Sequence, residues 1–113
     1  MVILGMANQQ RIDLLHKFIE EEPESAFNKY ALAMEYYEDE PEKSLKILST
    51  LIVDSPNYLP SYYKTAHLYW AMEQFDKAAE IFLLGIELAK LQNDQKALGE
   101  LSSSYLNLQF EME

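Results

Sequence analysis

The chain has no cysteine, only 3 glycines among its 113 residues, and far fewer basic than acidic side chains. Without cysteine it can form no disulfide framework, thiol nucleophile or cysteine-based metal site. The scarcity of glycine, together with 49% hydrophobic residues, argues against disorder and is typical of a compact helical protein. We expect a single domain with its own core.

The charge balance excludes whole classes of partner. Lys and Arg number 9 against 19 Asp and Glu, for a net charge of −10. Nucleic acids and anionic membranes need a basic surface, so neither is expected, whereas an apolar or basic protein partner remains open. No apolar run approaches the ~20 residues of a membrane span. Met1–Met6 lacks the length and basic start of a signal peptide, and we interpret it as a frayed leader or an expression remnant. A cytoplasmic location is expected by default.

Six helices are predicted, and no segment alternates as a strand does. They run from about 9 to 21, 26 to 38, 41 to 53, 60 to 71, 76 to 91 and 95 to 110. Apolar residues recur at helical spacing, as in the series Ala78, Phe82, Ile86 and Ala89. Proline and acid-rich segments separate the helices. Asn8 is the predicted cap of the first helix, and Asn93 or Asp94 that of the last.

The helices repeat along the chain. Ala33, Ala66 and Gly99 are spaced by 33 residues, and Ser44 and Ala78 are spaced by 34. One helical hairpin cannot bury both of its apolar faces, so copies of it are expected to stack.

This pattern resembles the tetratricopeptide repeat, which has a period of ~34 and the consensus W-x2-L-G-x2-Y, then A-x3-F, then P. The first repeat reads Lys29-x2-Leu32-Ala33-x2-Tyr36, then Ser44-x3-Leu48, then Pro56. The second reads Tyr62-x2-Thr65-Ala66-x2-Tyr69, then Ala78-x3-Phe82. Lys90 stands where the second repeat should have its proline, which predicts a longer or more continuous junction before the sixth helix.

The resemblance implies an all-α solenoid of antiparallel helical hairpins, with about six helices in a right-handed superhelical stack. It divides the single domain 1–113 into a half repeat (8–23), two repeats (26–57 and 58–91) and a capping helix (94–110). The alternative is an ordinary helical bundle with an accidental period.

In this family the first helix of each repeat lines a concave groove that binds a peptide or helix of a partner. Matching positions gives Phe27, Tyr30, Met34 and Tyr37, beside Ala31, in the first repeat, and Tyr63, Lys64, His67 and Trp70, beside Pro60, in the second. Tyrosine and tryptophan suit such a surface because each joins a polar group to an apolar body. Alternatively, half of these aromatic residues pack between repeats or under the sixth helix.

The predicted function is a protein-interaction module with mainly apolar and aromatic recognition. A clamp for a carboxylate is not expected, because only Lys64 and His67 could meet an anion. A homodimer that buries the groove is the alternative. No enzymatic activity, cofactor or metal is expected: neither histidine has a Ser or Asp companion at a suggestive spacing in the sequence, and the pair His16 and Glu20 lacks a third ligand.

Overall fold

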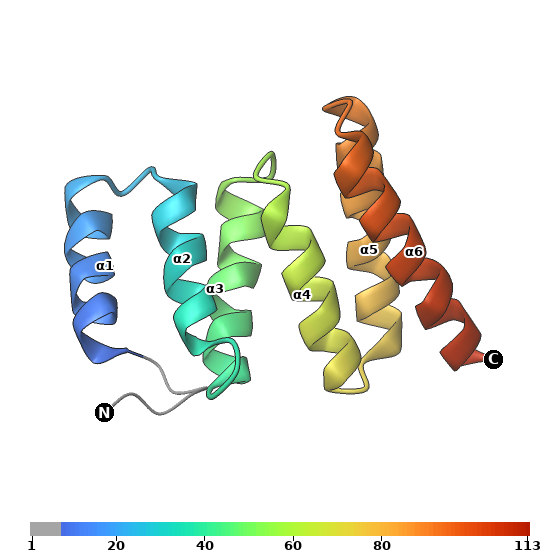
Figure 1. Ribbon diagram of the computed structural model, residues 1–113, viewed down its shortest axis with the longest axis horizontal. Helices are drawn as coiled ribbons and strands as arrows, with labels where there is room; N and C mark the ends of the chain where they lie inside the picture. Colours follow the sequence, from blue (N-terminus) through green and yellow to red (C-terminus); the bar gives the residue numbers. More distant parts are fainter. Residues whose placement is uncertain (1–7) are drawn as a thin grey trace. The chain divides into compact units, whose positions relative to one another are not determined.

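The computed structural model describes residues 8–113, so the predicted leader Met1–Met6 lies outside the described residues. Within that range the chain forms six helices and no strand (Figure 1). They are α1 (Gln9–Glu21), α2 (Ala26–Tyr36), α3 (Pro41–Asp54), α4 (Pro60–Ala71), α5 (Phe75–Leu91) and α6 (Gln95–Met112). The prediction of an all-α protein is confirmed. The helices fall into two compact units, one that ends at Pro56 and one that covers Asn57–Glu113.

Polar side chains cap three helices, two of them, α1 and α6, at predicted positions. The side chain of Asn8 accepts a hydrogen bond from the Arg11 amide, and Ser25 caps α2 in the same way. Asp94 accepts from the amide of Ala97 at 3.0 Å, so it is Asp94 that caps α6. Each cap satisfies an amide that has no partner within its own helix. Proline opens α3 and α4, where a missing amide hydrogen costs nothing.

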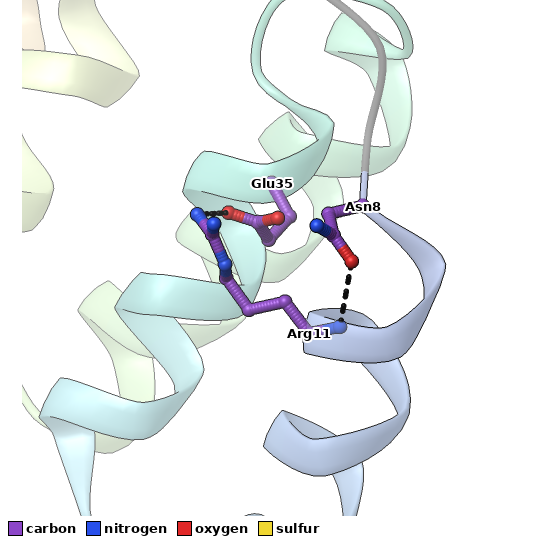
Figure 2. A network of polar contacts seen from close by, with 3 residues as sticks. All are labelled: Asn8, Arg11 and Glu35. Carbon is purple, nitrogen blue, oxygen red and sulfur yellow. Dashed lines mark hydrogen bonds and ion pairs between the residues drawn. The ribbon is translucent and has the colours of Figure 1, made fainter. Parts of the chain in front are cut away.

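In the first unit α2 packs against both α1 and α3. Four buried side chains form the core between α1 and α2, namely Ile12, Leu15, Leu32 and Tyr36. An ion pair spans the same two helices, with a guanidinium nitrogen of Arg11 3.3 Å from a carboxylate oxygen of Glu35 (Figure 2). On its other side α2 approaches α3 closely. Ala33 is fully buried there, and the Ser44 hydroxyl donates to its carbonyl at 2.7 Å.

In the second unit α5 packs against both α4 and α6. Its core consists of Leu59, Ala66, Ala78, Phe82, Ala89, Leu101 and Leu108. Ala78, Phe82 and Ala89 lie on the face of α5 that the helical spacing predicts, and all three are fully buried. Small residues such as Ala66 and Ala78 let the helices approach, and Phe82 fills the space that remains.

The junction before α6 differs in part from the prediction. It spans only Gln92–Asp94, whereas the corresponding junction between α3 and α4 spans Ser55–Leu59. The expectation of a longer junction was therefore wrong, and the alternative of two more nearly continuous helices is the one observed. Asn93 takes a left-handed conformation with φ 56°, and the amide of Asp94 donates to the carbonyl of Ala89. This Schellman motif ends α5 without a proline, and asparagine tolerates the left-handed conformation better than most residues.

Candidate protein-interaction site

The predicted site residues of the first repeat lie along one side of α2. Phe27 is 66% exposed, and the other three side chains, Tyr30, Met34 and Tyr37, are half-buried. Phe27, Tyr30 and Met34 recur at the i, i+3 and i+7 positions of α2, and Tyr37 follows as the residue that caps its end, so they form a continuous stripe. This stripe is separate from Leu32, Ala33 and Tyr36, which are buried against the neighbouring helices.

On α4 the predicted residues form a ladder of rings. The ring centroids of Tyr63 and His67 are 4.4 Å apart, and those of His67 and Trp70 are 5.5 Å apart with an interplanar angle of 21°. All three side chains, and that of Lys64, are half-buried. The order along the helix follows from the spacing of three and four residues, which places successive rings one turn apart.

A buried ring of α5 supports this aromatic ladder, Tyr63–His67–Trp70. Phe82 is fully buried and meets His67 edge to face, with centroids 5.3 Å apart. It meets Trp70 in the same manner at 6.2 Å. Edge-to-face contacts of this kind are favourable because the positive edge of one ring faces the negative face of another. The core therefore holds the ladder in place through Phe82.

Helix α6 also touches the ladder. His67 Nε2 hydrogen-bonds the hydroxyl of Ser104 at 3.2 Å, and Trp70 Nε1 donates to the carboxylate of Glu111. These partners were not predicted, because they lie 37 and 41 residues away and the sequence contains no pattern that couples them. Trp70 thus contacts both the core and α6, and its side chain is only partly exposed to solvent.

The ladder has little positive charge to offer an anion. Burial, and to a lesser degree the nearby charge of Lys64, lowers the pKa of His67 from its usual 6.5. The imidazole is therefore neutral at pH 7, and Lys64 supplies the only cation among the predicted site residues of α4. A lone lysine binds a carboxylate weakly in water, so the site suits apolar and aromatic groups.

Two hollows in the described surface are lined by other residues. A hollow of about 400 Å³ is lined by Glu73–Lys77, Glu111 and Met112, and one of about 280 Å³ by Lys29, Lys46, Ile47, Thr50, Leu51 and Asp54. Neither contains a predicted site residue. Over residues 8–113 no group of three or more His, Asp or Glu side chains is placed to hold a metal ion. Nor is any helix in that range both long and apolar enough to cross a membrane.

Consecutive helices packed in pairs, with small buried residues at a repeating interval, define a helical-hairpin repeat protein. Two solved structures of tetratricopeptide repeat domain proteins from Salinibacter ruber are similar to this chain. One, determined by NMR in solution, is 33% identical with a TM-score of 0.73, over 77% of this chain and 89% of its own. The other, a crystal structure, is 31% identical with a TM-score of 0.73, over 75% of this chain and 97% of its own. The chain belongs to the tetratricopeptide repeat family. No family model and no curated protein matches it.

Proposed function

We propose that this protein binds a peptide or helix of another protein through the stripe on α2 and the aromatic ladder on α4. Domains of this family generally mediate protein–protein interactions and are typically non-catalytic. The observation that carries the proposal is the ladder itself, in which Tyr63 is tilted against His67, His67 is stacked on Trp70, and the buried Phe82 supports both His67 and Trp70. The proposal includes no catalytic residue, cofactor or metal, and it places the protein in the cytoplasm.

Preorganised rings make good anchors for a partner. A side chain already held by the core loses little conformational freedom on binding, so more of the contact energy is retained as affinity. Tyr63 and Trp70 each combine a large apolar surface with a polar group, which suits a surface that is alternately wet and covered. The net charge of −10 favours a partner with basic flanks, mainly by accelerating association. An apolar or aromatic segment flanked by lysine or arginine fits both features.

Selection from a displayed peptide library tests this proposal without knowledge of the natural partner. We expect enriched peptides to contain apolar or aromatic residues with basic neighbours. Their affinity should fall about 30-fold or more in the Trp70→Ala and Phe27→Ala variants, the size of a binding hot spot. The matched control is Phe110→Ala, because Phe110 is 64% exposed on α6 and is not one of the proposed site residues. Peptides that bind all the variants equally would overturn the proposal.

A homodimer that buries the same surface is the second candidate. The exposure of Phe27, at 66%, favours it, because an exposed phenylalanine gains from any apolar contact. In that case Phe27→Glu should abolish self-association.

A further inference from the structure

Helix α6 carries an exposed stripe that points away from the core, with small side chains at one end and apolar ones at the other. Gly99, Ser103, Leu106 and Phe110 follow one another at steps of four, three and four residues, and all are exposed. Leu106 is 54% and Phe110 64% exposed, while Leu101 and Leu108 on the opposite side of the helix are buried. A Cβ atom added to Gly99 would meet nothing within 4 Å among the described residues. The equivalent Ala33 and Ala66 are completely buried, so this outer stripe of α6 lacks the cover that its counterparts have.

The stripe changes from small to large side chains along the helix, which makes it complementary to itself in the antiparallel direction. With a two-fold axis between residues 104 and 105, Phe110 of one copy faces Gly99 of the other. Leu106 then faces Ser103. Each large side chain meets a small one, which allows the close packing that two helices need. A two-fold contact of this kind uses the same surface on both copies.

The charges of α6 fit the same register. No residue from Leu101 to Phe110 is charged, although the chain as a whole carries −10. Around the same axis, Lys96 of one copy faces Glu113 of the other, and Glu100 faces the uncharged Gln109. The centre of the contact is therefore free of repulsion, and opposite charges meet at its ends, which favours this orientation over the parallel one.

We propose that two copies of this protein associate through antiparallel pairing of the outer stripe of α6. A single pair of helices buries less than the ~1,600 Å² of a standard interface, so the dimer is expected to be weak and reversible. The stripe contains none of the proposed site residues on α2 and α4. A dimer would consequently present two binding sites and could bind a bivalent partner with higher avidity.

Light scattering over a concentration series from about 10 μM to about 1 mM tests the association in the affinity range of such small interfaces. The average mass of the wild type should rise from the 13.2 kDa of one chain towards twice that value. Phe110→Glu and Leu106→Glu should hold it at the mass of one chain. The matched control Phe27→Glu, which changes an equally exposed phenylalanine on α2, should still dimerise. A flat mass for the wild type, or loss of the dimer in Phe27→Glu alone, would overturn the proposal.

Cysteine substitution tests the register, because the chain has no cysteine of its own. The double variant Ser103→Cys with Leu106→Cys places thiols of the two copies opposite each other. On mild oxidation it should form a covalent dimer much faster than Leu83→Cys with Leu84→Cys, whose positions are exposed on α5. Circular dichroism verifies that both variants keep the helical fold. Cross-linking no faster than in the α5 control would exclude this register.

Discussion

Gly85 on α5 lies directly against Tyr62 on α4. A Cβ atom added to Gly85 would be 3.0 Å from the Cβ of Tyr62 and 3.2 Å from Cδ2 of Leu101 on α6. At Gly85, therefore, α5 lies close to both α4 and α6, with no room for a larger side chain. Tyr62 occupies the position of the tryptophan in the repeat pattern. Its Cβ atom is bonded to the backbone of α4, so it can move away from Gly85 only if the helix moves.

The Gly85→Ala variant is expected to be less stable than the wild type by about 1–2 kcal/mol, the cost of overpacking. The net loss is expected even though alanine stabilises a helix interior by ~1 kcal/mol relative to glycine. Gly99→Ala is the matched control, because space is open around it, and it should gain about 0.5–1 kcal/mol. Urea unfolding at low protein concentration measures both. Changes of the same sign in the two variants would contradict the close approach at Gly85.

The stability of the second unit should depend on the protonation of His67. Burial depresses the folded-state pKa of His67 below its unfolded value near 6.5. Between these two values the unfolded state binds more protons, so stability rises with pH in that window. The contribution of the neutral ring is complete above pH 6.5 and is lost as the pH falls through the folded-state pKa.

Thermal unfolding at about pH 7.5 and about pH 5 checks this dependence, across the range in which histidine titrates. The melting temperature of the wild type should fall more over this interval than that of His67→Gln, which has no titrating ring. The charge of Lys64 is the second cause of the lowered His67 pKa. Lys64→Gln should therefore narrow the pH range between the folded-state and unfolded-state pKa of His67. Identical pH profiles for the wild type and His67→Gln would show that the ring does not contribute.

The two faces of α6 should respond very differently to truncation. Leu108 is fully buried, and Leu108→Ala is expected to cost about 2–5 kcal/mol, which combines lost burial with a cavity. Leu106 is exposed on the opposite face, and Leu106→Ala should change the stability of the monomer by less than about 0.5 kcal/mol. Guanidinium unfolding of the two variants distinguishes them. Equal losses would mean that α6 is rotated relative to the packing described.

Replacing two fully buried serines with alanine should change the stability in opposite directions. The hydroxyl of Ser44 donates to the carbonyl of Ala33, whereas that of Ser61 has no hydrogen-bond partner among the described residues. Ser44→Ala should cost about 1–2 kcal/mol because it leaves a buried carbonyl without that donor. Ser61→Ala should be neutral or stabilising, since it removes an unpaired buried hydroxyl. Denaturant unfolding of both variants gives the comparison, and a larger loss for Ser61→Ala would contradict the assignment.

Glu73 ends α4 in a left-handed conformation, with φ 59°. Residues other than glycine are strained in the left-handed conformation because of their Cβ atom. Glu73→Gly is therefore expected to stabilise the protein by about 0.5–1 kcal/mol. Glu73→Ala keeps the strain and serves as the control for loss of the carboxylate. The difference in melting temperature between the two variants isolates the backbone effect. A Gly variant no more stable than the Ala variant would contradict the strain.

Much of the fold could be predicted because it depends on local signals. Helical periodicity and proline placed the helices, Asn8 was correctly predicted as a cap, and the interval of 33 residues indicated the family. The junction after α5 was predicted to be longer or more continuous because the proline of the repeat pattern is missing there, and it is in fact shorter. A Schellman motif at Asn93 ends the helix by backbone hydrogen bonds instead, a solution that the repeat pattern does not encode.

For the candidate site, the sequence by itself determined which residues share a helix face, because the spacing of Tyr63, His67 and Trp70 is a property of the helix alone. Only the tertiary structure decided what covers that face. The contacts of His67 with Ser104, and of Trp70 with Glu111, join residues far apart in the chain. Such pairs depend on how α6 is rotated and placed on α4 and α5. That placement results from the combined packing of Leu101, Leu108 and Gly85, and no local pattern specifies it.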